Sequence, residues 1–201
     1  MSAVFQQLST ANVTAGLRKV TDDMKTKNRT DRTGVVGTIE KESRSGSHAF
    51  SKIVENQIGK KDLIIDDCDA KQSVYVYGCK DSVLQIQGKV NDITIDKCTK
   101  MGVVFKDVVA AFEIVNCNGV EVQCQGSAPT ISVDNTSGYQ LYLSKDSLET
   151  SISTAKSSEI NVLVPGAEPD GDWVEHSLPQ QYIHTLKDGR FETTPASHSG
   201  G

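Results

Sequence analysis

The sequence of 201 residues lacks several features that would assign it to common classes of protein. It has no apolar run near the roughly 18 residues that a membrane-spanning helix needs, and its polar first residues, MSAVFQQLST, contain no signal-peptide core. Its formal net charge of −5 argues against a protein built to neutralise nucleic-acid phosphates. We therefore expect no membrane span and no nucleic-acid partner, and we interpret the N-x-S/T sequons at Asn12, Asn28 and Asn135 as chance matches.

Histidine is missing between His48 and His176, and none of the cysteines forms a C-x-x-C pair. A zinc site built from cysteine and histidine is therefore excluded within that stretch, and we expect neither a metal nor a cofactor. In a chain without a secretory signal, free cysteines indicate a reducing compartment. We therefore expect a cytoplasmic protein. The cysteines are Cys68, Cys79, Cys98, Cys117 and Cys124.

A 19-residue repeat runs through the middle of the chain, and a short fixed period is typical of solenoid folds. Apolar residues recur at this spacing in four series. Two of them are Val76, Ile95, Ile114, Val133 and Ile152, and, about half a repeat away, Ile65, Leu84, Val103, Val122, Leu141 and Ile160. The other two are Val74, Ile93, Phe112 and Ile131, and Ile86, Phe105, Cys124, Leu143 and Val162.

Within each repeat apolar and polar residues alternate, as in VYVYGC at 74–79 and ITIDKC at 93–98, which is typical of strands with one buried face. We predict an all-β fold, a parallel β-helix of about six 19-residue coils with two short strands and two corners in each coil. A leucine-rich-repeat horseshoe would need the L-x-x-L-x-L consensus, which is absent. Residue types that tolerate the left-handed backbone of a sharp corner dominate two repeat positions. These positions are Gly78, Lys97, Asn116 and Asn135, and Gly88, Asp107, Gly126 and Lys145.

The flanks of the repeat region differ from it in composition. Residues 22–51 are charged and poor in large apolar groups, so we expect a flexible linker there, and PGAEPDGD at 165–172 is a second break. After this break, YIHTL and RFETT flank Asp188-Gly189, a pair typical of a two-residue hairpin turn. We therefore divide the chain into a motif at 1–21, the linker, and a domain at 52–201 that ends in a β-hairpin at 176–195.

The N-terminal motif has two parts. AVFQQLSTA at 3–11 places apolar residues on one stripe of a helix too short to be stable alone in water, so we expect it to fold against a partner. The tetrapeptide LRKV follows at 17–20. This order resembles the verprolin-homology motif of actin-monomer binders, and the resemblance implies actin contacts by both parts. The residues concerned are Val4, Phe5, Leu8, Leu17, Arg18, Lys19 and Val20.

LRKVTDDMKTKNR at 17–29, KIVENQ at 52–57, the coils and the closing hairpin together resemble the C-terminal part of cyclase-associated proteins, including plant forms. The resemblance implies a right-handed parallel β-helix, binding of ADP-actin monomers, faster exchange of ADP for ATP on actin, and no enzymatic activity of the chain itself. It also implies a homodimer that exchanges C-terminal hairpins and a location at the cytoskeleton; cofilin–actin complexes are a further candidate partner. The residues expected at the dimer contact are Trp173, Tyr182, Ile183, Leu186, Asp188, Gly189 and Phe191.

Two polar clusters in the repeat region are interpreted as structural. Cys79, Cys98 and Cys117 share one repeat position and should stack as a ladder, which does not converge on one point as metal ligands do. We interpret them as small apolar groups at a corner. The acidic run at 66–69 lacks the further carboxylates and the base of a lyase site, so we interpret it as a solvated corner.

An alternative function is a GTPase-activating module of the tubulin-binding cofactor C type, a related β-helix family. Such a module uses an arginine, whose guanidinium donates hydrogen bonds in a fork that lysine lacks. Arginine is missing between Arg44 and Arg190, and all eight cations from Lys71 to Lys156 are lysines. The sequence therefore favours actin binding. Candidate lysines for a contact of the β-helix with actin are Lys80, Lys97, Lys100 and Lys106.

Overall fold

The computed structural model describes residues 52–167 and 171–196, and the predicted motif at 1–21 and linker at 22–51 lie outside these ranges. The described residues form a parallel β-solenoid followed by an antiparallel hairpin, which confirms the predicted fold class. They include no helix long and apolar enough to cross a membrane. The elements are β1 (Lys52–Glu55), β2 (Leu63–Ile65), β3 (Ser73–Tyr77), β4 (Val83–Asp96), β5 (Gly102–Val115), β6 (Asn118–Cys124), β7 (Thr130–Asp134), β8 (Ser137–Leu143), the 3-10 helix η3 (Lys145–Ser147), β9 (Ser151–Ala155), β10 (Ser158–Val164), β11 (Val174–Ser177), β12 (Tyr182–Lys187) and β13 (Arg190–Pro195).

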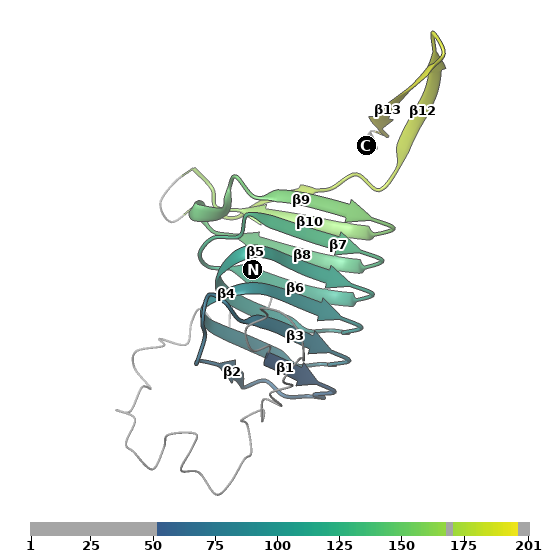
Figure 1. Ribbon diagram of the computed structural model, residues 1–201. Coiled ribbons are helices and arrows are strands. Elements are labelled where there is room, and N and C mark those ends of the chain that lie inside the picture. Colours follow the sequence, from purple (N-terminus) through teal and green to yellow (C-terminus); the bar gives the residue numbers. More distant parts are fainter. Residues whose placement is uncertain (1–51, 168–170, 197–201) are drawn as a thin grey trace, which may run out of the picture.

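The coils stack in two layers of strands, with β1 and β2 at the lower end and β9 and β10 at the upper end (Figure 1). The β3 layer stacks β1, β3, the second halves of β4 and β5, β7 and β9. The β8 layer stacks β2, the first halves of β4 and β5, β6, β8 and β10. Two short strands per coil were expected, but β4 and β5 each cross from one layer to the other without a break. Register shifts between residues 86 and 92 bend this pair of strands around the corner.

The core lies between the two layers and follows the 19-residue repeat in the central coils. Val76, Ile95, Ile114 and Val133 are Cα partners in successive strands, and each is at most 1% exposed. This column confirms the predicted stacking of one residue from every coil. The matching column of the β8 layer is Leu84, Val103, Val122 and Leu141.

The repeat lengthens at the upper end of the solenoid, where the prediction of a constant period was wrong. Val133 pairs with Thr154, so Ile152 belongs to the neighbouring interior column. Likewise, Ile160 pairs with Tyr139 instead of continuing the predicted series. The helix η3 adds residues to this coil, so the residues of β9 and β10 are displaced along their strands by one interior position.

The lower end shows the same effect. Leu63 pairs with Leu84, whereas the constant period had assigned Ile65 to that place. The longer connection between β2 and β3, which contains a turn closed by the bond from the Gln72 amide to the Asp69 carbonyl, accounts for the shift. The 19-residue period is therefore a property of the central coils.

The tight corner that leads from the β3 layer to the β8 layer contains two left-handed residues in every coil, three positions apart. Their φ angles lie between 46° and 67°, the region that glycine and asparagine adopt most readily. This confirms the corner predicted at 78, 97, 116 and 135. The first positions are Asn56, Gly78, Lys97, Asn116, Asn135 and Lys156, and the second are Gly59, Asp81, Lys100, Gly119, Gly138 and Glu159.

The return corner, which leads back to the β3 layer, does not use left-handed residues at the predicted positions. At Gly126 a Cβ atom would overlap Asp107 and the Lys106 carbonyl oxygen of the adjacent coil, and at Gly88 it would overlap Cys68. Close approach of stacked coils is therefore the reason for these two glycines. Residue 145, predicted to continue the series, instead begins η3.

The two ends of the solenoid are built differently. At the lower end Lys52 points inward, is 4% exposed and forms an ion pair with Asp67, so one carboxylate of the acidic run has a structural partner. At the upper end β11 pairs antiparallel with β10 and extends the β8 layer. By contrast, β9 pairs with β7 on one side and with no other strand of the described residues. The upper edge of the β3 layer is therefore open.

The predicted hairpin consists of β12 and β13, which pair with each other and stand away from the stack (Figure 1). Asp188 and Gly189 have φ angles of 48° and 75°, as a two-residue turn of the predicted type requires. Residues 176 and 177, assigned to the hairpin from the sequence, belong to β11 in the solenoid. Every residue of β12 and β13 is exposed.

Tyr139 places a hydroxyl group in the core without a hydrogen-bond partner among the described residues, although its side chain is 0% exposed. Because an unpaired buried hydroxyl is destabilising, Tyr139→Phe is expected to raise the free energy of unfolding by about 1 kcal/mol. Urea denaturation measures the change. Tyr142→Phe is the matched control, because the Tyr142 hydroxyl donates a hydrogen bond to Gln140 at 3.3 Å and its loss should bring no gain. A clear loss of stability in Tyr139→Phe would mean that this hydroxyl has a partner.

Candidate interaction surfaces

The structure does not describe the residues predicted to form the N-terminal actin motif, so those assignments stay predictions. The surfaces considered below belong to the solenoid and the hairpin. The motif residues outside the described ranges are Val4, Phe5, Leu8, Leu17, Arg18, Lys19 and Val20.

A row of lysines follows the tight corner. Lys80, Lys97 and Lys100 are exposed there on neighbouring coils. Lys97 donates a hydrogen bond to the Tyr77 hydroxyl at 3.3 Å, and its ammonium lies 5.2 Å from the centroid of that ring. Lys106 lies on β5 beside the return corner, so the fold does not bring it to the other three. The tight corner thus carries a basic edge that a negatively charged protein surface would complement.

The cysteine ladder lies buried at this corner, as predicted from the shared repeat position. The amide of Cys79 donates to Cys98 Sγ at 3.4 Å, that of Cys98 to Cys117 Sγ at 3.3 Å, and that of Cys117 to Thr136 Oγ1 at 3.2 Å. The thiols therefore satisfy backbone donors at the corner in addition to filling space, a role that the sequence pattern did not reveal. Thr136 and Ser157 continue it with hydroxyl groups.

Hydrogen bonding and burial raise the pKa of two of these thiols, whereas the hydrogen bonds that Cys117 receives from Cys98 lower the pKa of Cys117. The hydrogen bond with Cys117, together with burial, raises the pKa of Cys98 to about 12. The hydrogen bond with Cys98 and burial likewise raise the pKa of Cys79 far above its ordinary value. Because the thiolate is the reactive form and the metal ligand, Cys79 and Cys98 stay in the unreactive form, and all three thiols are buried. No group of three or more His, Cys, Asp or Glu side chains within residues 52–167 and 171–196 is arranged to hold a metal ion.

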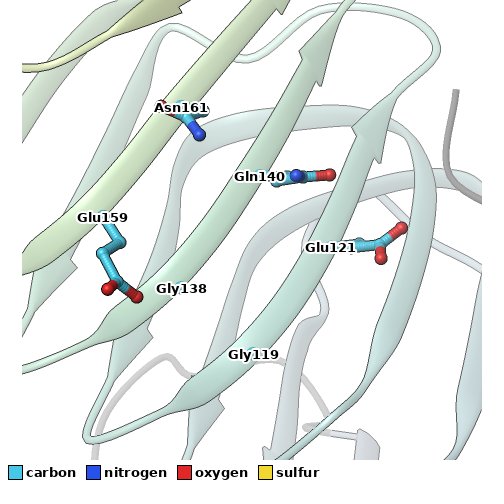
Figure 2. A pocket seen from close by; sticks show the side chains of 6 residues that line it. All are labelled: Gly119, Glu121, Gly138, Gln140, Glu159 and Asn161. Atoms are coloured by element: carbon cyan, nitrogen blue, oxygen red, sulfur yellow. The ribbon is translucent and has the colours of Figure 1, made fainter.

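A shallow depression of about 410 Å³ opens where the tight corner meets the outer face of the β8 layer. Figure 2 shows glycine backbone in its floor and polar side chains projecting from three adjacent strands, β6, β8 and β10. A second hollow of about 260 Å³, near Lys61 and Lys100, lies beside it and shares two of its lining residues. Its polar lining suits side chains of a protein partner better than an apolar ligand. The first depression is lined by Gly119, Glu121, Gly138, Gln140, Glu159 and Asn161.

Trp173, predicted to anchor a dimer, contacts its own chain on the outer face of the β8 layer. Its ring meets Tyr142 edge to face, with centroids 5.3 Å apart and an interplanar angle of 88°. Val104 and Leu163 complete this small apolar cluster. Sequence patterns did not indicate this contact, because Trp173 follows the break at 165–172 and is placed by β11, which begins at the next residue and pairs with β10.

The outer face of the β3 layer, here called the β3 face, carries carboxylates held by neighbouring side chains. Asp96 accepts hydrogen bonds from the Tyr75 hydroxyl at 2.9 Å and from Asn116 Nδ2 at 3.1 Å. Asp92 accepts one from Ser73 Oγ at 2.7 Å. Partial burial and the bond to Asp96 raise the pKa of Tyr75 to about 12. This tyrosine is therefore a hydrogen-bond donor at neutral pH.

The six remaining residues predicted at the dimer contact all lie on the protruding hairpin. Leu186 and Phe191 are cross-strand partners, and they are 62% and 71% exposed. Together these two side chains form an exposed apolar pair on one face of the hairpin. The hairpin residues concerned are Tyr182, Ile183, Leu186, Asp188, Gly189 and Phe191.

Comparison with known proteins agrees with this architecture. A solved structure described as cyclase-associated protein from Cryptosporidium parvum superposes with a TM-score of 0.69 and 28% identity, over 79% of this chain and 99% of that one. Cyclase-associated protein 1 of Arabidopsis thaliana is 74% identical over 100% of this chain, and adenylyl cyclase-associated protein of Dictyostelium discoideum is 45% identical over 98%. In both, the match covers 45% of the relative, so this chain spans about half the length of these relatives.

The fold and its surfaces define a parallel β-solenoid with a basic corner, an acidic face and a protruding hairpin. The family model for the adenylate cyclase associated (CAP) C terminal matches residues 42–198. The chain belongs to this family of cyclase-associated protein C-terminal domains.

Proposed function

We propose that this chain binds actin monomers, prefers the ADP-bound form and promotes exchange of the bound nucleotide, and so supports actin filament turnover at the cytoskeleton in the cytoplasm. The observation that carries the proposal is the family match over residues 42–198, preceded in the sequence by a motif that resembles those of actin-monomer binders. The motif at 1–21 provides one contact. The basic edge of Lys80, Lys97 and Lys100 provides a second, suited to an acidic protein surface.

Exchange is accelerated by differential binding. A binding partner shifts actin toward an open nucleotide cleft only if it binds the open form more tightly than the closed form. Contacts from two separate parts of one chain can do this, because each can grip a different portion of the actin monomer. This mechanism requires no covalent chemistry from the chain. Cofilin-bound actin monomers are a further partner to be tested in the same assay.

The proposal includes a homodimer formed through the hairpins. An isolated two-stranded hairpin is marginally stable in water, and the apolar side chains of β12 and β13 have no cover among the described residues. The open edge of β9 offers unpaired backbone groups, and its sequence SISTA has neither proline nor charge to block strand addition. The hairpin of a second copy would pair with the open edge of β9 and would thereby cover its own apolar side chains.

A GTPase-activating role is disfavoured by the absence of arginine between Arg44 and Arg190, because lysine does not supply the forked hydrogen bonds of an arginine finger. Single-turnover GTP hydrolysis by tubulin or a small GTPase should therefore be unchanged when this chain is added. Acceleration would restore the alternative.

Replacing Leu17, Arg18, Lys19 and Val20 together with alanine is expected to weaken binding of ADP-actin monomers by about tenfold or more, the scale for loss of anchor residues. Titration of fluorescently labelled ADP-actin measures the affinity. The melting temperature should not change, since these residues lie outside the described core. The control, Lys25→Ala with Lys27→Ala, removes two positive charges without touching the tetrapeptide and should not weaken binding. Unchanged affinity in the variant with all four alanines would remove the motif from the proposal.

A further inference from the structure

The outward positions of the β3 face carry charge of one sign. Strand alternation sends every second residue of β1, β3, β7, β9 and the second halves of β4 and β5 outward. Among these described positions there is no lysine or arginine, because Lys52 points inward. Five carboxylates remain on the face: Glu55, Asp92, Asp96, Glu113 and Asp134.

Asp92, Asp96 and Glu113 accept hydrogen bonds from neighbouring side chains, but these bonds do not neutralise their charge. Within the described residues none of the five carboxylates forms an ion pair, and Asp134 Oδ1 has no hydrogen-bond donor. Lys97 reaches the face from the tight corner, where it is engaged with Tyr77. Hydrogen bonds from Tyr75 and Asn116 fix Asp96, while Glu55 and Glu113 are exposed. The face is therefore an acidic surface with two fixed carboxylates, Asp92 and Asp96, and two exposed ones, Glu55 and Glu113, that a basic segment can contact.

A basic segment of the same chain is joined to this face. Residues 17–32, LRKVTDDMKTKNRTDR, contain six cations and three carboxylates. The chain continues from residue 33 to Lys52, the first residue of β1, which is the lowest strand of this layer. Residues 33–51 can span up to about 60 Å, whereas six stacked strands cover roughly 25 Å. The segment can therefore reach any part of the face.

We propose that residues 17–32 dock on the β3 face of their own chain. The tether keeps the segment at an effective concentration in the millimolar range, above that of a second copy in solution, so the contact forms within one chain. It is electrostatic and weakens with salt. Its consequence rests on the function proposed above: Arg18 and Lys19 cannot contact the β3 face and actin at once, so docking lowers the apparent affinity of the motif for actin.

Zero-length carbodiimide cross-linking of the full chain at low salt, with the products mapped by mass spectrometry, tests the contact. Lys19, Lys25 or Lys27 should become joined to carboxylates of the β3 face, and the yield should fall at high salt. Glu55→Gln with Glu113→Gln should lower this yield by about three- to tenfold, the scale for loss of two exposed charge contacts. The matched control, Asp146→Asn with Glu149→Gln, removes two exposed carboxylates beside the return corner and should leave the yield unchanged.

An equal fall in both double variants, or no cross-link to the β3 face, would overturn the docking. Mixing isotopically heavy and light chains shows which chain supplies the docked segment. Links between heavy and light peptides would show that the segment of a second copy binds instead. The actin assay separates the two proposals. If Glu55→Gln with Glu113→Gln loses the cross-link and binds actin more tightly, the docking and the proposed function both stand. If no variant binds actin, the proposed function fails, and the cross-links alone still decide whether the segment docks.

Discussion

Ile114→Ala is expected to lower the free energy of unfolding by about 2–5 kcal/mol, the range found when a buried aliphatic side chain is truncated. Ile114 is 0% exposed and stacks between Ile95 and Val133, so no solvent or mobile chain can fill the cavity. Urea denaturation followed by circular dichroism measures the loss. The dependence of stability on urea should stay the same if the solenoid unfolds as one unit.

Ile152→Ala is the matched control for this experiment. Ile152 has the same side chain, but it lies in the terminal coil, is only partly buried and has no strand above it among the described residues. Its truncation should therefore cost clearly less than that of Ile114. Equal costs at the two positions would contradict the placement of Ile114 at the centre of a stacked core.

A chain that ends after Gln180 is expected to be monomeric at micromolar concentration, whereas the intact chain should be a dimer. This cut removes β12 and β13 but keeps β11, which pairs with β10, and Trp173, which packs on Tyr142. A cut after Asp172 would also remove these two parts of the fold, so it could not separate dimerisation from stability. Sedimentation velocity measures the oligomeric state, and release of a fluorescent nucleotide from actin measures exchange, which should be slower with the shortened chain.

Point substitutions test the same contact without shortening the chain. Leu186→Ala with Phe191→Ala removes the exposed apolar pair on one face of the hairpin, and it should shift the dimer toward monomer. Thr185→Ala with Thr194→Ala changes the opposite face by alternation and should leave the dimer intact. An intact chain that sediments as a monomer would eliminate the exchange of hairpins altogether.

The family resemblance and the surfaces of the structure bear on different parts of the proposed actin binding. The N-terminal motif lies outside the described residues and stays a prediction from sequence order, which rests on two local features, a short amphipathic stretch and a basic tetrapeptide. The basic edge could be predicted only in part. Lys80, Lys97 and Lys100 do meet at the tight corner, whereas Lys106 lies beside the return corner, because its place within the repeat falls after a strand of the β8 layer.

The sequence by itself determined the features that depend on local or periodic patterns. The alternation of apolar residues specified the strands, and the constant 19-residue spacing specified that Val76, Ile95, Ile114 and Val133 form one column. Asp188-Gly189 specified the hairpin turn, since few other residue pairs adopt two successive positive φ angles without strain.

Only the tertiary structure decided the features that depend on which coil meets which. Extra residues before β3 place Leu63 in the position predicted for Ile65, and those in η3 place Thr154 in the position predicted for Ile152. Trp173 contacts Tyr142 only because β11, which follows it, pairs with β10. The acidic β3 face arises partly in the same way. Asp96 and Asp134 are two 19-residue periods apart, so the period aligns them, whereas Glu55 joins their outward column only because the first coil is longer. The place of Glu55 is set by the length of the connection before β3, which the period does not encode.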